Sequence, residues 1–340
     1  MRNRSVVLFG ALPPPVGGVS IHLERFLNEL EKSDWAGCLI DVKRRVATDV
    51  YGGNVSLWVA LSLFFKAEIV HIHISNSIKV IVAFLSRVLG KKVIYTHHNN
   101  VIGNKYLFQL LIMVCNKVIF VNEKCVPSRL YRNDFRRKWE VIPAFIPPVK
   151  TDPLPRHVLD AISPYDTVLS TNAYKKSLIY GQEVYGIDLV LKLYTKLVSC
   201  DFEKSIVLIF FDPSGTHKSQ VEAVLGSIDA SKKAEVAFLY FSEPSLSFFE
   251  LLKISHASIR ATRTDGDSLS IRESLFLGVP VITSDVVDRP KGCVLFRSGC
   301  ADDLFFKVLD LINNDVAVNP ASQYFFSDVI NLYENLRGGE

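Results

Sequence analysis

Short apolar runs alternate with amphipathic stretches along the whole chain. In the first half, the apolar runs predict strands at Ser5–Phe9, Glu68–Ile74, Lys92–Thr96 and Lys117–Val121. Apolar residues at positions 19, 23, 26, 27 and 30 predict a helix from Val19 to Leu30. This alternation is typical of βαβ units, in which helices cover both faces of a parallel sheet. The sequence therefore predicts an α/β fold.

A second series of the same kind follows a proline-rich stretch. Six prolines within residues 143–164 predict a stiff linker, because proline fixes the backbone φ angle. The strands predicted after it are Thr167–Thr171, Ile206–Phe211, Val236–Tyr240, Ala257–Arg260, Val279–Thr283 and Cys293–Phe296. We therefore expect an N-terminal domain over residues 1–150, a linker over 151–165 and a C-terminal domain over 166–320. A C-terminal helix over 321–340 could return to the N-terminal domain.

Length and composition agree with this division and exclude several classes of protein. A chain of 340 residues with 49% hydrophobic residues is long enough for two domains and too apolar for a disordered protein. No run of 18 apolar residues is present, so we expect no membrane span. The six cysteines form no C-x-x-C pair and indicate reduced thiols in a cytoplasmic protein without a structural metal.

Charge is distributed unevenly between the two halves. Residues 1–150 contain 21 Lys/Arg and 10 Asp/Glu, a net charge of +11, whereas residues 151–340 contain 18 and 25, a net charge of −7. The positive half favours an anionic partner such as a phospholipid surface or a lipid diphosphate, and we expect no nucleic acid. A basic face without a specific partner is the alternative.

The segment from Asp265 to Asp285 contains the strongest candidate site. It follows a predicted strand, and Ser268 is a good N-cap for a helix over Leu269–Leu277. The free N–H groups at a helix start favour a bound anion. Asp265 in the preceding loop and Glu273 on the second turn place one carboxylate on each side of such an anion, which suits a sugar diphosphate. The alternative is that these carboxylates only decorate a solvated turn and a helix face.

This segment resembles the E-x7-E signature of family 4, the retaining glycosyltransferases of the GT-B fold. Asp265 stands at the position of the first Glu of that signature, and Glu273 stands at the second. The resemblance implies two Rossmann-like domains that face each other across a cleft. It also implies that Asp265 faces the reacting sugar, that Glu273 binds the ribose hydroxyls, and that the N–H groups of Ser268 and Leu269 meet the β-phosphate.

Two further motifs carry the same resemblance. Gly17 and Gly18, in the loop after the first strand, resemble the P-x-x-G-G loop that lines the cleft near the sugar-donor phosphates. Glycines there let a ligand approach the backbone closely. His98 follows a predicted strand and resembles the family's T-x-H element, which implies a hydrogen bond to the donor sugar. A plain strand-to-helix turn and a structural histidine are the alternatives.

One departure concerns the sugar diphosphate. The family clamps it with an Arg and a Lys, but this sequence has Tyr180 and Tyr185 at those positions. Tyrosines cannot neutralise a diphosphate as this cationic pair does. We expect another cation to replace the pair, with Lys175 as the first candidate and Arg260 and Arg263 next.

Taken together, the sequence predicts a retaining glycosyltransferase that moves a sugar from a nucleotide-sugar donor without a metal. By resemblance, it would act in bacterial surface-polysaccharide assembly (O-antigen, capsule or exopolysaccharide) on an acceptor linked to a polyprenyl diphosphate. We expect it to lie peripherally on the anionic inner face of the cytoplasmic membrane. A GT-B epimerase or phosphorylase, and a non-catalytic nucleotide-sugar-binding protein, are the alternatives.

Overall fold

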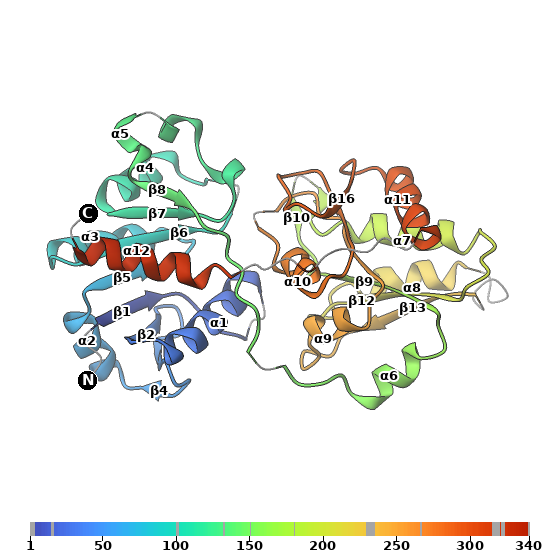
Figure 1. Cartoon of the computed structure of the whole chain (residues 1–340), viewed down its shortest axis with the longest axis horizontal. Coiled ribbons are helices and arrows are strands. Elements are labelled where there is room, and N and C mark those ends of the chain that lie inside the picture. The colour runs from blue at the N-terminus through green and yellow to red at the C-terminus, as the bar shows by residue number, and fades with distance from the viewer. Residues whose placement is uncertain are drawn as a thin grey trace. The chain divides into compact units, whose positions relative to one another are not determined.

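The chain folds into two compact units in the computed structural model (Figure 1). Unit 1 contains residues 1–149 and 324–340, and unit 2 contains residues 150–323. The structure describes residues 4–338 apart from 15, 16, 100, 101, 132, 150, 180, 229–234, 266, 315–319 and 321–323. Tyr180 therefore lies outside the described residues. The C-terminal segment belongs to unit 1, where helix α12 (red in Figure 1) lies along the sheet.

Unit 1 contains an eight-stranded sheet with the order β4-β3-β2-β1-β5-β6-β7-β8. Its strands are β1 Arg4–Phe9, β2 Trp35–Asp41, β3 Val46–Asp49, β4 Asn54–Val55, β5 Ile69–Ile72, β6 Lys92–His97, β7 Lys117–Phe120 and β8 Trp139–Val141. The pairs β2–β3 and β3–β4 are antiparallel, and the others are parallel. Because β1 pairs with both β2 and β5, the direction of strand addition reverses at β1.

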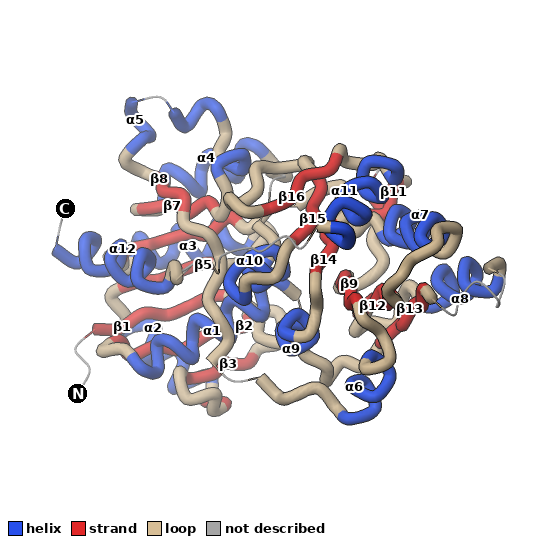
Figure 2. The backbone as a smooth tube through the Cα atoms, turned by 45° about the vertical axis from the view of Figure 1, so that its right-hand side comes forward, coloured by secondary structure: helices blue, strands red, loops and turns tan. Residues whose placement is uncertain are grey.

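Helices cover both faces of this sheet. Helices α2, α3 and α4 share one core cluster with the sheet, whereas α1 and α12 share the cluster on the opposite face. The helices of unit 1 are α1 Gly18–Lys32, α2 Leu57–Lys66, α3 Ile78–Val88, α4 Lys105–Val114, α5 Asn133–Arg136 and α12 Phe326–Gly338, with 3₁₀ turns at Glu123–Cys125 and Ser128–Tyr131. Figure 2 shows these helices in blue against the red strands.

Unit 2 contains a six-stranded parallel sheet with the order β13-β12-β9-β14-β15-β16. Its strands are β9 Thr167–Asn172, β12 Ile206–Phe211, β13 Val236–Phe241, β14 Ala257–Arg260, β15 Val281–Ser284 and β16 Cys293–Phe296, and a small hairpin pairs β10 Leu178–Ile179 with β11 Gln182–Glu183. β9 pairs with both β12 and β14, so strand addition reverses at β9 in the same way.

The central strands of unit 2 are buried on both faces. In β12, residues 206, 208 and 210 pack into one core cluster, and residues 207, 209 and 211 pack into the other. The helices of unit 2 are α6 Arg156–Ile162, α7 Ile187–Leu197, α8 Lys218–Gly226, α9 Phe248–Lys253, α10 Leu269–Leu277 and α11 Ala301–Asn313. A strand without a polar face leaves only its ends for chemistry, so the site must lie at the strand ends.

The strands predicted from the apolar runs are confirmed within about two residues at each end. β12, β14, β16 and helix α10 have the predicted bounds. The proline-rich stretch differs from a simple linker, because α6 forms within it. Val158 and Ile162 of α6 are buried in the core of unit 2, and this burial stabilises a helix that the surrounding prolines conceal.

No helix in the described part of the chain is long and apolar enough to cross a bilayer.

The backbone just before α7 requires a glycine, because Gly186 adopts a left-handed φ of 68°. A Cβ atom on Gly186 would lie 2.0 Å from the carbonyl oxygen of Ala261. Only glycine can therefore hold the start of α7 this close to the loop after β14.

This close approach predicts that Gly186→Ala destabilises unit 2 strongly. The substitution adds both the cost of a left-handed alanine, about 1 kcal/mol, and a clash with backbone that must shift, for a total of at least about 3 kcal/mol. Gly181→Ala is the matched control, because Gly181 has a φ of 76° and nothing within 4 Å of its Cβ position. Calorimetry should give a clearly lower Tm for Gly186→Ala, and equal Tm values would refute the packing argument.

Candidate functional site

Asp265 lies in the loop between β14 and α10, and it is held by two arginines. Its Oδ2 atom accepts a hydrogen bond from Arg289 Nη1 at 2.9 Å and lies 3.5 Å from Arg260 Nε. The side chains of all three residues are largely buried. Both contacts use Oδ2, so Oδ1 stays outside the two ion pairs. The loop thus presents one carboxylate oxygen between two guanidinium groups.

Arg289 is a residue that sequence reasoning missed. It follows β15, and its Nε donates to the carbonyl oxygen of Ser284 at 2.9 Å. Its side chain is only 2% exposed, so the guanidinium needs its three oxygen partners, which are Asp265 Oδ2 and the carbonyl and hydroxyl oxygens of Ser284. The available signal was its position, because Arg289 comes just after a predicted strand, at the carboxyl edge where ligands of α/β sheets bind.

The start of α10 has the geometry expected for anion binding. Ser268 is the N-cap, with φ −79° and ψ 120°, but its side chain caps no N–H group and its Oγ lies 3.0 Å from Ser270 Oγ. Leu269 is the first residue of the helix, and Glu273 on the next turn is buried. The Ser268 hydroxyl therefore leaves the N–H groups of the first turn to other partners, and a helix start favours an anionic one.

A second buried ion pair shapes the same helix. Arg272 Nε donates to both carboxylate oxygens of Asp267, at 2.7 Å and 2.6 Å. Both side chains are less than a tenth exposed. Asp267 thus ties the loop to α10. The loop before α10 is therefore fixed on both sides, by Asp265 toward β14 and β15 and by Asp267 toward the helix.

The three candidate cations occupy different environments. Arg263 donates to both oxygens of Asp188 at 2.7 Å and to the carbonyl oxygen of Glu183, so it joins the loop after β14 to the start of α7. Its hydrogen bonds to Asp188 raise the pKa of Arg263. Lys175 follows β9 and is exposed. Lys175 is therefore accessible to a ligand, whereas Arg263 is engaged with the protein.

Arg260 stands at the carboxyl end of β14, next to β9. Its guanidinium carbon lies 5.1 Å from the centre of the Tyr185 ring, and its Nη1 lies 3.5 Å from the carbonyl oxygen of Asn172. A cation held over an aromatic face is stabilised by the ring quadrupole. Tyr185 stands at the position where the family that this sequence resembles has a lysine. Its ring stabilises the guanidinium group of Arg260 at the end of β14.

The glycine loop of unit 1 has open space above it. Gly17 is the N-cap of α1 and has an extended φ of −154°. Any residue can adopt this conformation, so the backbone does not require glycine here. The Gly17 N–H donates a hydrogen bond to the Ser20 hydroxyl oxygen at 2.9 Å. A Cβ on Gly18 would meet nothing within 4 Å. Protein packing does not require these glycines, and a ligand close to the backbone would.

His98 belongs to a cluster of histidines inside unit 1. Its Nε2 lies 2.9 Å from His73 Nδ1, and its ring centre is 5.5 Å from that of His22 on α1. His71 completes the cluster, with its ring centre 4.2 Å from that of His73. The cluster joins the start of α1, which carries Gly17 and Gly18, to the carboxyl ends of β5 and β6.

These four histidines are kept neutral. Burial lowers the pKa of His22 to about 4 and that of His71 to about 3. Burial, together with the neighbouring histidines, holds the pKa values of His73 and His98 well below the usual range. His71 bridges the Tyr333 hydroxyl at 2.6 Å and the Thr96 hydroxyl at 2.7 Å. A neutral ring can accept from one hydroxyl and donate to the other.

The proton positions in the His73–His98 pair follow from burial. His73 Nε2 is buried without a hydrogen-bond partner among the described residues. An unpaired lone pair costs less than an unpaired N–H, so His73 carries its proton on Nδ1 and donates it to His98 Nε2. His98 then carries its own proton on Nδ1. The cluster therefore leaves His98 with one N–H that can serve a ligand.

Within the described residues, no group of three or more His, Cys, Asp and Glu side chains could hold a metal ion. Each of the six cysteines is a free thiol.

Of the predicted site residues, Gly17, Gly18 and His98 belong to unit 1, and the others belong to unit 2. Asp265 and Arg260 are in direct contact, and Ser268, Leu269 and Glu273 share one helix.

Comparison with known proteins identifies the fold. The HepE protein of Anabaena in complex with UDP-glucose superimposes with a TM-score of 0.67 and 9% identity, over 99% of this chain and 100% of that one. The lipopolysaccharide outer core galactosyltransferase WaaB gives a TM-score of 0.59 and 12% identity, over 98% and 99%. This chain has the GT-B fold. The predicted fold class is therefore confirmed.

Other GT-B proteins show similar agreement. A putative UDP-N-acetylglucosamine 2-epimerase from Listeria monocytogenes gives a TM-score of 0.59 and 13% identity, over 98% of this chain and 96% of that one. No family model matches the sequence, and no curated protein matches it. At identities this low, the GT-B fold is established and the activity has to be argued from the site.

The neutral histidines predict that stability falls in mild acid. The pKa of His22 is depressed in the folded state, so the unfolded chain takes up a proton below its usual pKa of 6.5 while the folded chain does not until about 4. Stability is therefore present above about pH 6.5 and is lost as the pH falls toward about 4, by about 1.4 kcal/mol per pH unit for each such histidine.

The measurement is Tm as a function of pH between about 7 and about 5. His22→Asn, whose amide can still donate to the carbonyl oxygen of Ala144, should give a shallower decline than the parent chain. His157→Gln, at an exposed position of unit 2, is the control and should leave the slope unchanged. A parent Tm that does not fall over this range would contradict the neutral assignment.

Proposed function

We propose that this chain is a retaining glycosyltransferase that transfers a sugar from a nucleotide-diphosphate donor. The observation that supports this most directly is the loop before α10, where Asp265 stands between two arginines beside a helix start that Ser268 leaves uncapped. Carboxylates bind sugar hydroxyls, and helix N–H groups and guanidinium groups bind phosphate. The loop offers both kinds of group within one short segment.

In this proposal, the sugar donor binds along the carboxyl edge of the unit 2 sheet. The N–H groups of Ser268 and Leu269 meet the β-phosphate, and Glu273 binds the ribose hydroxyls. Arg260, supported by Tyr185, and the exposed Lys175 replace the missing Arg/Lys clamp. Because neighbouring GT-B structures were solved with UDP-glucose and UDP, uridine diphosphate sugars are the first donors to test.

Asp265 and His98 are the proposed catalytic residues. Transfer with retention requires a stabilised, positively charged sugar and a diphosphate leaving group, so positioning and electrostatics supply most of the rate. The Oδ1 of Asp265, which lies outside the two ion pairs, would face the sugar, and the Nδ1–H of His98 would donate a hydrogen bond to a sugar hydroxyl. We propose no metal, since the arginines and the helix start offset the charge of the diphosphate.

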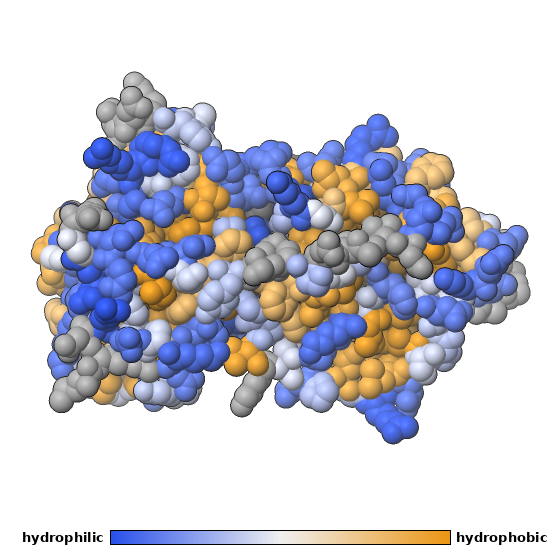
Figure 3. Space-filling view, viewed as in Figure 1, coloured by the Kyte–Doolittle hydropathy of each residue, from blue (hydrophilic) through white to orange (hydrophobic). Residues whose placement is uncertain are grey.

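The acceptor in this proposal is linked to a polyprenyl diphosphate of surface-polysaccharide assembly, and unit 1 meets the bilayer through an apolar face. Helices α2, α3 and α4 cover the same side of the unit 1 sheet. The apolar face consists of the exposed side chains Trp58, Val59, Leu61, Phe65, Ile81, Phe84, Leu85, Val88, Tyr106, Leu110 and Met113 on these helices. Apolar atoms are also visible at the left edge of Figure 3, where α3 lies in Figure 1.

Exposed apolar surface of this extent marks an interaction site, and the surrounding charge is basic. Lys66 ends α2, Arg87 lies in the last turn of α3, and Lys105 begins α4. Each Lys or Arg near an anionic bilayer contributes about 1 kcal/mol, and the inserted apolar side chains add to this. The proposed location is therefore peripheral, on the cytoplasmic face of the membrane.

The sugar-donor site predicts different kinetic effects for its two carboxylates. Asp265→Asn removes the charge that faces the reacting sugar and should lower kcat by about a hundredfold. Glu273→Gln weakens binding in the ground state and the transition state alike, so it should raise KM for the sugar donor by about tenfold with little change in kcat. Initial-rate kinetics with a UDP-sugar and a lipid-linked acceptor analogue separate the two effects.

Asp201→Asn, at an exposed position of the same unit, is the charge-matched control and should retain both constants. An Asp265→Asn variant with the parent kcat would remove Asp265 from the chemistry. Consumption of the UDP-sugar without any acceptor would instead indicate an epimerase, as in the Listeria neighbour. Binding without turnover for every acceptor would indicate a non-catalytic protein.

The apolar face predicts selective binding to anionic vesicles. The parent chain should co-sediment with phosphatidylglycerol vesicles at low salt, be released at high salt, and stay in the supernatant with neutral vesicles, because screening weakens the contribution of the basic residues. Phe65→Ser combined with Val88→Ser removes two large side chains from the face. Each contributes about 1 kcal/mol or more when inserted, so the double variant should bind at least about tenfold more weakly.

Phe306→Ser is the matched control, because Phe306 on α11 of unit 2 is 64% exposed and Phe65 is 63% exposed. It should bind vesicles like the parent chain. Equal recovery of the parent chain in the supernatant with both kinds of lipid would refute the membrane proposal and favour a water-soluble acceptor.

A further inference from the structure

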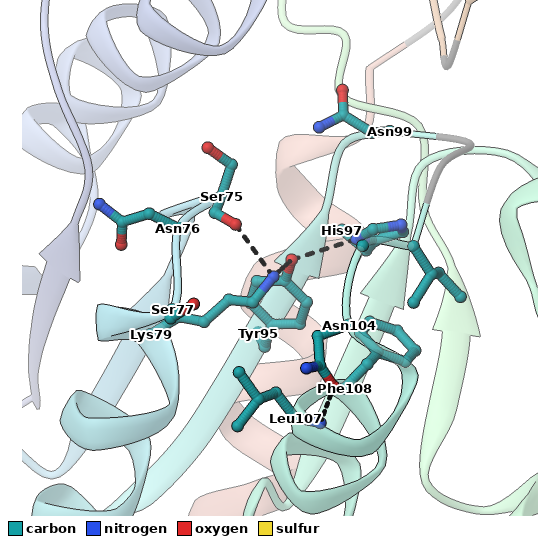
Figure 4. A pocket seen from close by; sticks show the side chains of 12 residues that line it. Ser75, Asn76, Ser77, Lys79, Tyr95, His97, Asn99, Asn104, Leu107 and Phe108 are labelled. Carbon is teal, nitrogen blue, oxygen red and sulfur yellow. Dashed lines mark hydrogen bonds between the residues drawn. The ribbon is translucent and has the colours of Figure 1, made fainter.

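Unit 1 contains a pocket of about 180 Å³ whose lining residues have no role in the sugar transfer proposed above. It lies at the carboxyl ends of β5 and β6, beside the starts of α3 and α4 (Figure 4). Sites for drug-sized ligands have volumes of roughly 300–1,000 Å³, so this pocket suits a small group better than a nucleotide. Its side chains therefore decide what it can hold.

Lys79 brings a positive charge to the pocket wall. Its ammonium group donates to the carbonyl oxygen of Ser75 at 3.2 Å and to the Tyr95 hydroxyl at 3.0 Å, which leaves its third hydrogen unused by these contacts (Figure 4). Burial lowers the pKa of Lys79, which means that the surroundings disfavour an unaccompanied charge. An anion in the pocket would compensate that charge.

Tyr95 connects Lys79 to His97 through hydrogen bonds. Because the Tyr95 oxygen accepts from Lys79, its own hydrogen can go to His97 Nδ1, which lies 3.1 Å away. Burial lowers the pKa of His97 to about 4, so the ring is neutral and carries a single proton. Its Nε2 atom is buried and has no partner among the described residues. His97, which is 4% exposed, therefore lines the pocket as a neutral ring.

Two asparagines add further hydrogen-bond donors. Asn76 Oδ1 accepts the N–H of Ile78 at the start of α3, and Asn104 Oδ1 accepts the N–H groups of Tyr106 and Leu107 at the start of α4. Each oxygen is engaged at a helix start, so the NH₂ group is the part of each side chain that can donate. No Asp or Glu is among the described residues that line the pocket. The pocket is therefore rich in hydrogen-bond donors and carries one cation.

We propose that this pocket binds a phosphate group of the lipid-linked acceptor. Phosphate accepts hydrogen bonds through all its free oxygens and carries the negative charge that would compensate the Lys79 ammonium group. The two helices that border the pocket, α3 and α4, also carry part of the apolar face, which places the pocket on the part of unit 1 that the proposal brings to the bilayer. This inference rests on the proposed function, because it assigns a binding site to the acceptor of that reaction.

The test measures binding by isothermal titration calorimetry with inorganic pyrophosphate and with farnesyl diphosphate. Both should bind the parent chain, and the prenyl compound should bind more tightly because its chain adds contacts with the apolar face. Lys79→Met should weaken both ligands by about tenfold to a hundredfold, the loss expected for one charge-assisted hydrogen bond. Tyr95→Phe keeps the ring but breaks the connection to His97, and it should weaken both ligands less than Lys79→Met does.

Lys43→Met, at an exposed lysine of unit 1 outside the pocket, is the matched control and should bind like the parent chain. If neither ligand bound the parent chain, or if Lys79→Met and Tyr95→Phe bound normally, the pocket would not be a phosphate site. Binding of pyrophosphate and farnesyl diphosphate with equal affinity would assign the pocket to a soluble phosphate and overturn the lipid-linked acceptor.

UDP-sugar binding, measured on the same variants, separates this inference from the proposed function. The sugar-donor residues belong mainly to unit 2, so Lys79→Met should keep the parent affinity for the UDP-sugar. Normal sugar-donor turnover without pyrophosphate binding would refute only the pocket. Pyrophosphate binding without any UDP-sugar binding would refute the glycosyltransferase proposal and leave the phosphate site in place.

Discussion

Burial of the parallel strands on both faces is the constraint on which the rest of this structure depends. A strand such as β12 has no polar face, since its residues alternate between two apolar clusters. Polar side chains can therefore gather only beyond the strand ends. Strand addition reverses at β1 and at β9, and the loops after these two strands contain Gly17 and Lys175. The candidate residues from distant parts of the sequence lie in such positions because the sheets leave no others.

Charge near these strand ends is organised by ion pairs within the protein. Asp265 forms ion pairs with Arg260 and Arg289, and the Tyr185 ring also contacts the Arg260 guanidinium. A guanidinium group that is already fixed loses little conformational entropy when a phosphate arrives. Tyr185 stands where the family that this sequence resembles has a lysine, and its ring positions the Arg260 guanidinium at the end of β14.

The sequence predicted the fold class and many of the strands because apolar runs report burial directly, and the bounds of β12 and β14 followed from them, whereas β2, β3, β4 and β8 were not predicted. It could not predict contacts that depend on tertiary distance. Arg289 meets Asp265 across 24 residues, and Tyr333 meets His71 across 262. Proline content concealed α6, whose helix depends on packing rather than on local propensity. The roles assigned to Asp265, His98 and Glu273 remain predictions, because they require a ligand.

Unit 1 combines an apolar core with a basic, apolar exterior, and α3 and α4 contribute to both. Their buried sides pack on the sheet, and their outward sides carry part of the apolar face. Their first turns use asparagine oxygens as caps, which turns the amide NH₂ groups toward other partners. A helix start that needs an oxygen cap therefore creates a hydrogen-bond donor as a by-product. With Lys79 and His97 at the same edge, the ordinary requirements of capping produce a donor-rich pocket beside a surface suited to lipid.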